Sequence, residues 1–535
     1  MNITSLSFII FIFALWVIYY ILPKKYQWIL LLIASIGFYI YGGATSIIYV
    51  LLTSLSVYVA TCFIEKLAIK NKLYIKENKN ILSKEEKKKS KEKIKKQRRA
   101  IIVVTIIFNL AFLGIFKYSH FFIEQINSLL KIIDIGQINN TFNLIIPIGI
   151  SYYTLQAIGY MVDVFWGKSK AEKNYFKVLL FISFFPQITQ GPISEYNYLS
   201  RELFKEHTCT YENFSRGFQR LLWGFFKKMV VADALSPYVT TVLSGYEEYT
   251  GITCVVGALL YMFQLYADFS GYMDIMCGYC EMLDIKLTEN FNRPYFSKSI
   301  AELWRRWHIS LGAWLRTYVY YPVAVSKWNQ RLSQKIRKPF GDYVAGKIAA
   351  TVPLLFVWFS IGLWHDASWE YIGWGFGNAF FIILSVWLEP VYESTRNRLS
   401  INEKSFIFKS FQIVRTFVIF TFLEIVAAVY AMGGNGFNYI KRIFTNTSIP
   451  HSLNALFPTS KGLSNFSTIM LLLALGGLII MFFVSLLQRK KQVRDYFNKI
   501  PIIIRIMIIA LTLIVIVSFG VQNSWGAGAF MYENF

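Results

Sequence analysis

The sequence predicts an all-α, polytopic transmembrane bundle of about eleven spans, with short re-entrant or interfacial helices between them. The chain has 535 residues, of which 55% are hydrophobic and 18% aromatic. Several apolar runs reach the roughly 17 to 25 residues that an α-helix needs to cross hydrocarbon. Tyr and Trp rings favour the two water–lipid interfaces, which accounts for the many aromatic side chains. A soluble helical protein of this size does not need so much apolar surface, so a bilayer is the expected solvent.

The first three apolar runs, at residues 6–22, 27–41 and 46–64, are predicted spans. The first run lacks the basic start and the small-residue cleavage site of a signal peptide, so we expect it to be retained. The next segment, 65–99, holds 13 Lys and 2 Arg against 5 Glu. Positive charge of this kind accumulates in short cytoplasmic loops. We therefore expect a solvated cytoplasmic loop at 65–99 and an N-terminus outside.

The rest of the chain contains both plain spans and irregular apolar segments. Gly, Pro and isolated acids interrupt the middle runs, which indicates kinked or partly buried segments. Two basic loops, at 323–347 and 391–409, are expected on the cytoplasmic side, so the turn at 365–369 and the C-terminal Phe535 are expected outside. The runs at 348–364 and 370–390 are predicted to form a tight helical pair. The other apolar segments after residue 99 are 100–118, 144–162, 176–190, 215–244, 253–280, 411–431, 466–487 and 500–520.

The net charge and the cysteines exclude two other classes of function. The chain carries a formal net charge of +24. Apart from Tyr74, however, the Lys-rich segment has no aromatic residue among its charges on which a base could stack, so no nucleic-acid partner is expected. The five cysteines are an odd number at irregular spacing, which indicates no disulfide framework. Cys277 and Cys280 lie in an apolar run with no second pair, so they are interpreted as buried thiols and no metal site is expected.

Only two of the five histidines lie among tryptophans. His308 lies in a segment with helical periodicity, in which Trp304 and Trp307 belong to an apolar stripe that continues to Tyr318. Arg305 and Arg316 project beside this stripe, where guanidinium groups are able to hold an anionic group. The alternative is an interfacial helix whose arginines meet lipid phosphates.

The second histidine, His365, lies between Trp364 and Trp369 at the turn of the predicted helical pair. An imidazole has a pKa near 6.5, so at the end of a dry helix it is able to take a proton from a hydroxyl group and return it. A structural histidine is the alternative. Ser368 is not interpreted as a nucleophile, because no G-x-S-x-G turn surrounds it. Asp268 and Asp274 lie in an apolar run, where an acid is a candidate for function, and hydrogen bonding between helices is the alternative.

Six motifs together give the chain a resemblance to a known family. They resemble the membrane-bound O-acyltransferases, and in particular the bacterial branch that includes the alginate O-acetylation and teichoic-acid D-alanylation proteins. The resemblance is strong over about residues 110–390 and looser in the tail. The motifs occupy residues 147–156, 185–193, 266–274, 289–295, 304–311 and 363–365.

The resemblance implies a helical bundle around a central funnel and tunnel, with His365 as the catalytic histidine and His308 as the second histidine of this branch. It divides one integral membrane domain into N-terminal spans with the basic loop (1–99), a catalytic core (100–390) and C-terminal spans (391–535). The chain has Asp366 and Thr317 where the family often has Gly and Asp. We expect substrate to contact Arg305, Arg316, Trp304, Trp307, Trp364, Asp268, Asn290 and Asn292.

The function implied by the resemblance is acetyl transfer across a bacterial cytoplasmic membrane. The expected donor is acetyl-CoA or another cytoplasmic acetyl thioester, with no bound cofactor. The expected acceptor belongs to an exopolysaccharide or cell-wall polymer, reached directly or through an extracytoplasmic SGNH-type acetyltransferase or a polymer-synthesis complex. Three alternatives remain. They are D-alanyl transfer to teichoic acid, for which members tend to be shorter than this chain, a transporter or flippase for a lipid-linked or acyl substrate, and a structural scaffold for an exopolysaccharide export complex.

Overall fold

The computed structural model is helical, and no β-strand occurs in the part of the chain that it describes. That part comprises residues 3–43, 46–134, 136, 138, 146–458, 465–489 and 491–520. The backbone divides into two compact units, each of which is considered by itself. The first unit comprises Met1, Phe13–Cys209 and Leu283–Thr288, and the second comprises Asn2–Ile12, Thr210–Met282 and Glu289–Phe535.

Seven helical segments in the described ranges are long and apolar enough to cross a membrane, or eight if one pair bent by 55°, Trp369–Trp387 with Glu389–Arg398, is counted as a span. The chain is therefore a multi-pass membrane protein, and the predicted all-α bundle is confirmed. The seven segments are Ile47–Glu77, Lys84–Ile132, Gly251–Met282, Lys327–His365, Phe406–Ala431, Thr468–Leu487 and Ile502–Phe519.

This number is smaller than the eleven or so spans predicted, because several apolar runs form shorter or broken helices. The run at 27–41 becomes a helix of 16 residues, and the run at 176–190 contains a helix of only 9 residues. The run at 215–244 is broken by a π-helical turn, Phe226–Ala232, between two α-helices. Residues 144 and 145 and the two chain ends, whose sides of the membrane were predicted, lie outside the described residues.

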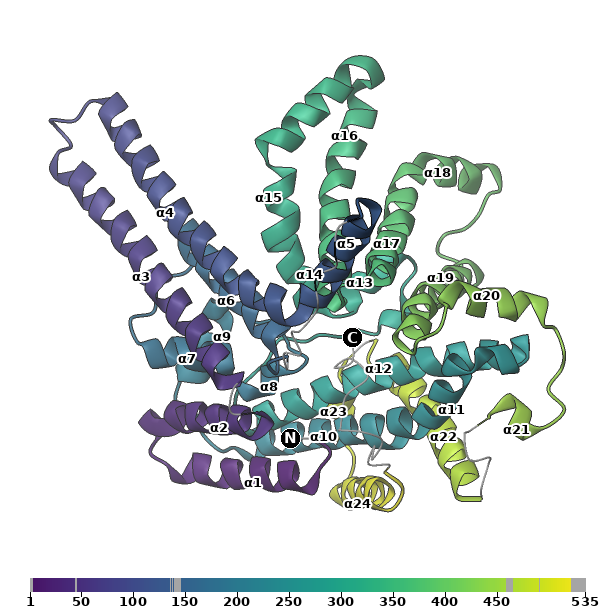
Figure 1. The fold of residues 1–535 in the computed structure, drawn as a ribbon. Helices are drawn as coiled ribbons and strands as arrows, with labels where there is room; N and C mark the ends of the chain where they lie inside the picture. Colours follow the sequence, from purple (N-terminus) through teal and green to yellow (C-terminus); the bar gives the residue numbers. More distant parts are fainter. Residues whose placement is uncertain are drawn as a thin grey trace. The chain divides into compact units, whose positions relative to one another are not determined.

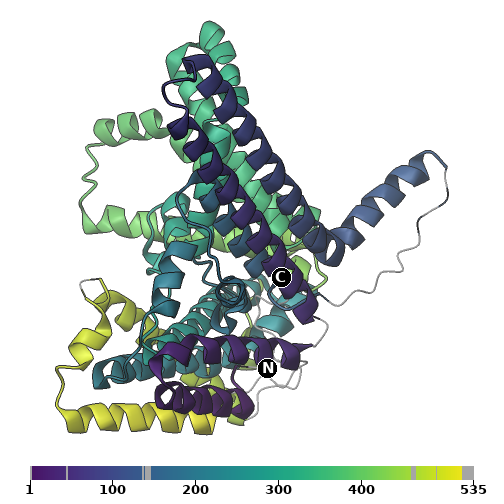
Figure 2. The same ribbon diagram turned by 90° about the vertical axis from the view of Figure 1, so that its left-hand side faces the viewer.

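The first unit contains a long helical hairpin, α3 and α4, which run side by side (Figures 1 and 2). The Lys-rich segment 65–99 is therefore mostly helical, where a loop was predicted, because Lys and Glu are good helix formers. Ser83 begins α4 with a capping box, in which its hydroxyl accepts from Glu86 N–H and its own N–H donates to the Glu86 carboxylate at 2.8 Å. The elements of this region are α1 (Leu6–Ile21, shared between the units), η1 (Lys24–Tyr26), α2 (Gln27–Gly42), α3 (Ser46–Glu77), α4 (Lys84–Leu113), η2 (Gly114–Tyr118), α5 (Ser119–Ile132), α6 (Ile150–Trp166), α7 (Tyr175–Ser183), α8 (Phe185–Ile188) and α9 (Tyr196–Phe204).

The second unit holds the remaining helices. In it, the predicted basic loop at 323–347 is also helical, with a kink at Gly341, whose φ is +79°. The elements are α10 (Tyr211–Phe225), η3 (Phe226–Ala232), α11 (Asp233–Ser244), η4 (Tyr246–Glu248), α12 (Gly251–Met282), η5 (Pro294–Phe296), α13 (Ile300–Arg306), α14 (Ile309–Leu315), η6 (Arg316–Tyr320), α15 (Tyr321–Ala324), α16 (Lys327–His365), α17 (Trp369–Trp387), α18 (Glu389–Arg398), α19 (Phe406–Ala431), α20 (Gly436–Thr445), α21 (Leu453–Leu456), α22 (Asn465–Leu487), α23 (Val493–Phe497) and α24 (Ile502–Phe519).

Two pairs of helices in this unit approach closely at glycines. In the predicted pair α16–α17, a Cβ on Gly362 would lie 2.5 Å from the Tyr371 carbonyl oxygen, and one on Gly375 would lie 2.5 Å from that of Trp358. In α10–α12, a Cβ on Gly217 would lie 2.6 Å from the Gly278 carbonyl oxygen. No side chain fits at these distances, so glycine permits the close contact. The first approach fixes the turn after His365, and the second brings the polar residues of α10 against those of α12.

Candidate functional site

His308 lies at a break between α13, which ends at Arg306, and α14, which begins at Ile309. The single amphipathic helix predicted through Trp304, His308 and Tyr318 is therefore wrong. The break is held from outside the segment, because Asn290 accepts the Ile309 N–H at its carbonyl oxygen (3.0 Å) and the Ser310 N–H at Oδ1 (3.0 Å). These bonds supply acceptors for N–H groups that begin α14 and would otherwise lack them.

The backbone of His308 adopts a left-handed conformation with φ +45°. Such a conformation is strained for a side chain other than glycine, and strained residues of this kind cluster at functional sites. The His308 side chain is buried, and its ring centroid is 5.0 Å from that of Phe269 and 6.1 Å from that of Trp364. Burial lowers the pKa of His308 to about 3. The imidazole is therefore neutral at physiological pH, with one ring nitrogen able to accept a proton.

His365 is the last residue of α16, as the sequence predicted, and only 6% of its surface is exposed. Its ring centroid lies 5.1 Å from those of both Trp364 and Trp374, and 6.2 Å from the nearly parallel ring of Tyr371. Because Trp364 also contacts His308, one indole packs against both imidazoles. We call His308, Trp364, His365 and Trp374 the histidine cluster. The structure thus brings together two histidines that are 57 residues apart in the sequence (365 − 308).

The two other predicted tryptophans belong to the aromatic packing around this cluster, Trp304 partly exposed and Trp307 buried. Trp304 donates its indole N–H to Asn378 Oδ1 at 2.9 Å, and its ring meets that of Trp374 at 5.7 Å. Trp307 is only 2% exposed and packs against Phe291 at 5.1 Å. Both rings are held in place by the protein, which indicates a supporting role, and direct contact with substrate stays a prediction.

The predicted charged residues lie in different surroundings. Asp268 is buried on α12 and accepts a hydrogen bond from Lys228 Nζ at 2.5 Å, while the same ammonium pairs with Asp233 at 2.9 Å. This arrangement matches the alternative interpretation of Asp268, a polar tie between helices. Arg305 on α13 and Arg316 at the start of η6 are exposed, and neither is among the residues that line the cavity described next. Their predicted contact with substrate remains untested.

A cavity of about 470 Å³ lies within the second unit. Two of the predicted residues, Asn290 and Asn292, line it, as does Ile309, the neighbour of His308. The opposite part of the lining comes from α22, α23 and α24, including Met481, Phe497 and Ile508. The cavity combines amide and charged groups with apolar side chains, which suits a ligand that has both polar and apolar parts.

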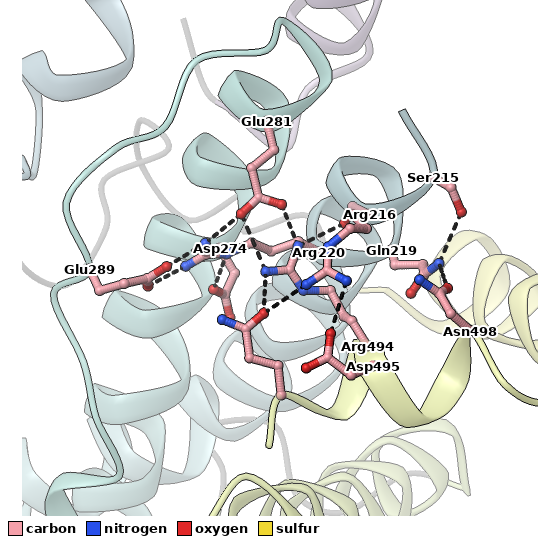
Figure 3. Close-up of polar contacts among 11 residues, drawn as sticks. Ser215, Arg216, Gln219, Arg220, Asp274, Glu281, Glu289, Arg494, Asp495 and Asn498 are labelled. Carbon is pink, nitrogen blue, oxygen red and sulfur yellow. Dashed lines mark hydrogen bonds and ion pairs between the residues drawn. The ribbon is translucent and has the colours of Figure 1, made fainter. Parts of the chain in front are cut away.

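A group of paired charges borders this cavity, and sequence reasoning did not find it (Figure 3). Arg220 on α10 contacts Asp274 at 2.8 Å, Glu281 at 3.0 Å and Glu289 at 2.6 Å. Arg494 on α23 also pairs with Glu281. A signal existed in the sequence, because Asp274 and Glu281 are seven residues apart and so share one face of α12. We call Arg216, Arg220, Asp274, Glu281, Glu289, Arg494 and Asp495 the arginine network.

Comparison with known proteins identifies the segment that carries the whole histidine cluster and the arginine network apart from Arg494 and Asp495. Residues 169–422 match the model of the membrane-bound O-acyltransferase family. Over this segment, the chain is similar to that family. The matched O-acyltransferase segment contains every predicted site residue, from Asp268 to His365. Helices α22 to α24, which form part of the cavity wall, lie beyond it.

Three relatives illustrate the range of this O-acyltransferase family. The chain is 35% identical over 270 residues to the probable alginate O-acetylase of Azotobacter vinelandii, which covers 50% of each chain. It is 30% identical to the peptidoglycan O-acetyltransferase of Helicobacter pylori, over 51% of this chain and 53% of that one. It is 29% identical to the teichoic acid D-alanyltransferase of Bacillus subtilis, over 44% and 58%. The chain thus spans about half the length of the curated relatives it matches.

Proposed function

We propose that the chain is a membrane O-acyltransferase that moves an acetyl group to a hydroxyl of a cell-surface polymer or of a protein that serves one. The observation that carries this proposal is the histidine cluster, in which Trp364 packs against both His308 and His365 among aromatic rings. Burial among these rings keeps the His308 imidazole neutral, the form that accepts a proton. The cluster lies inside the segment that is similar to the O-acyltransferase family.

The proposed chemistry uses His365 as the general base. Its imidazole takes the proton of the acceptor hydroxyl while the oxygen attacks the carbonyl carbon of an acetyl thioester. The carbon–sulfur bond then breaks, and the imidazolium returns the proton to the leaving thiolate. His308, kept neutral by burial, orients the reacting groups or relays the proton. This sequence of steps leaves an acetyl ester and a free thiol.

The proposed donor is acetyl-CoA or another acetyl thioester that enters from the cytoplasmic side. The cavity next to His308 supports this assignment, because its amide and charged groups suit a polar carrier and its apolar wall suits the acyl end. The tunnel that the family resemblance implies would connect this cavity with the histidine cluster. Asn290 and Asn292, which line the cavity, are the proposed donor contacts among the predicted residues.

The proposed acceptor is a polymer outside a bacterial cytoplasmic membrane. The alginate and peptidoglycan acetylating relatives favour a sugar hydroxyl, and transfer through an extracytoplasmic SGNH-type partner is compatible with the same chemistry. The positive charge of the Lys-rich hairpin of α3 and α4 supports a cytoplasmic position for it, and with that an N-terminus on the outer side. D-alanyl transfer, as in the Bacillus subtilis relative, is the second candidate, because the same base serves either acyl group.

The test compares His365→Ala with His451→Ala, a control in which an exposed loop histidine is replaced. Removal of a general base costs about 10² to 10⁴ in rate. We expect His365→Ala to lose the alkali-labile acetate on the isolated surface polymer while the protein still reaches the membrane, and His451→Ala to match wild type. A wild-type amount of acetate in the His365→Ala strain would disprove the assignment. Alkali-labile D-alanine in place of acetate on the polymer of the wild-type strain would identify the second candidate.

An acetyl-transfer assay with purified protein in detergent distinguishes the enzyme from a transporter, because detergent solution has no compartments between which a substrate could be moved. Transfer of ¹⁴C-acetyl from acetyl-CoA to added deacetylated polymer supports the enzyme. Acetate that reaches the polymer only in sealed vesicles supports the transporter.

A further inference from the structure

A buried carboxyl group lies behind the histidine cluster and needs a reason to be there. Glu424 is on α19, one of the membrane-spanning helices, and only 8% of its surface is exposed. An acidic side chain inside a span is costly to place and is rarely kept without a function. Glu424 lies two residues beyond the segment 169–422 that matches the family.

The Glu424 carboxyl group is bonded to the tryptophan that packs on His365. Its Oε1 accepts the indole N–H of Trp374 at 3.0 Å. The Trp374 ring is nearly perpendicular to the His365 imidazole, at 83° and 5.1 Å between centroids. This hydrogen bond favours a single rotamer of Trp374. The fixed indole in turn limits the orientations that the His365 imidazole can adopt.

Asn378 on α17 makes further hydrogen bonds that hold the tryptophans around Trp374. Asn378, one turn after Trp374, donates to the Trp374 carbonyl oxygen at 3.1 Å and accepts the Trp304 indole N–H at 2.9 Å. The Trp304 ring then packs edge-on against Trp374. The indoles of Trp304 and Trp374 are therefore each held by a hydrogen bond, Trp304 to Asn378 and Trp374 to Glu424. Trp374 is the member that touches the imidazole.

We propose that Glu424 is a positioning residue, which holds Trp374 so that the Trp374 ring edge keeps the His365 imidazole in its reactive orientation. The proposal rests on the proposed function, since it assigns a role to a neighbour of the general base. The rate of acyl transfer depends steeply on the placement of the base, and a displacement of about 1 Å costs up to about a hundredfold. Loss of the bond therefore affects the chemical step more than the binding of donor.

The test measures kcat and KM for the thioester with purified Glu424→Leu and Glu424→Gln proteins. Glu424→Leu removes the acceptor, so we expect kcat to fall about ten- to a hundredfold with KM within about twofold of wild type. Glu424→Gln retains an oxygen acceptor and is expected to restore most of kcat. A Gln variant as inactive as the Leu variant would show that the ionisable group itself is required and would overturn the proposal.

Trp374→Phe provides an independent route if Glu424→Leu fails to fold. This change removes the indole N–H but keeps an aromatic ring against His365, so it should lower kcat like Glu424→Leu, and the double variant should lose no more than either alone. The matched control is Trp387→Phe on the same helix, whose N–H donates to Thr351 Oγ1 at 3.2 Å, and it should keep wild-type kcat.

The outcomes separate this proposal from the proposed function. If His365→Ala abolishes transfer while Glu424→Leu and Trp374→Phe keep wild-type kcat, the positioning role is wrong and the general base stands. If Glu424→Leu lowers only the unfolding temperature and not kcat, Glu424 is a tie between α17 and α19. Wild-type transfer by His365→Ala would remove the basis of both proposals.

Discussion

The arginine network and the histidine cluster both lie within the second unit, but they differ in what surrounds their polar side chains. In the network, together with Lys227, four cations meet four acids, and each acid is within 3.0 Å of a cation. In the cluster, both imidazoles pack against aromatic rings. Groups that neutralise one another are held in place by charge, whereas the imidazole of His308 is kept neutral by burial among aromatic rings. We therefore expect the first centre to stabilise the protein and the second to carry the proposed chemistry.

The largest effect on folding is expected from Arg220→Ala. Arg220 is 8% exposed and holds three acids. Its removal takes away the ion pair of Glu289 and leaves Asp274 and Glu281 with one cationic partner each. Loss of one member of a buried ion pair typically costs about 3 to 5 kcal/mol. We expect the free energy of unfolding in detergent to fall by about 3 kcal/mol, measured by chemical denaturation. A variant as stable as wild type would show that the network contributes no stability.

The next effect concerns activity and not stability. We expect His308→Asn to lower kcat about ten- to a hundredfold, equivalent to about 1.4 to 2.7 kcal/mol of activation free energy. Asn is chosen because it tolerates the left-handed conformation of residue 308 better than other side chains do. Full activity in a stopped-flow thioester assay would confine His308 to a structural role and leave the cluster with one functional imidazole.

A third effect is the pH dependence of folding stability that the buried His308 causes. Burial lowers the pKa of His308 to about 3, below the usual value, so the unfolded chain binds a proton at this residue before the folded chain does. The stability that His308 contributes is therefore complete above pH 6.5 or so and is lost as the pH falls toward 3. Between pH 6.5 and 5 the loss is about 2 kcal/mol.

The measurement compares unfolding free energies of wild type and His308→Asn over this interval, in which most carboxylates remain ionised. Burial also lowers the pKa of His207, which adds a slope common to both proteins. The difference between the two slopes isolates His308. Equal slopes would mean that the imidazole is accessible to protons in the folded state.

The smallest effect is expected at the exposed edge of the arginine network. Arg216 lies one helical turn before Arg220 on α10 and pairs with Asp495 at 2.9 Å, but the two side chains are 26% and 39% exposed. Exposed pairs contribute little, because water competes for both charges. We expect Arg216→Ala to shift the unfolding midpoint by about a third or less of the shift caused by Arg220→Ala. Equal shifts would mean that burial does not decide which pairs stabilise the protein.

Sequence patterns predicted the features that depend on local order. Seven of the predicted apolar runs became candidate spans, the pair around residue 365 became α16 and α17, and His365 ends a helix as expected. The two histidines were recognised because each lies among tryptophans. Patterns failed where distant segments intervene, as at His308, where Asn290 holds a break that helical periodicity cannot reveal. The arginine network was missed for the same reason, since Arg220 and Glu281 are 61 residues apart.

The sequence by itself determined that this chain crosses a membrane several times and that His308 and His365 are its candidate reactive groups, because hydropathy and residue chemistry are local properties. Only the tertiary structure decided that Trp364 packs against both imidazoles, that Glu424 lies behind them and that the arginines of α10 and α23 are neutralised. Such contacts depend on how closely helices approach, and that distance is set by glycines and side-chain shapes on two segments at once.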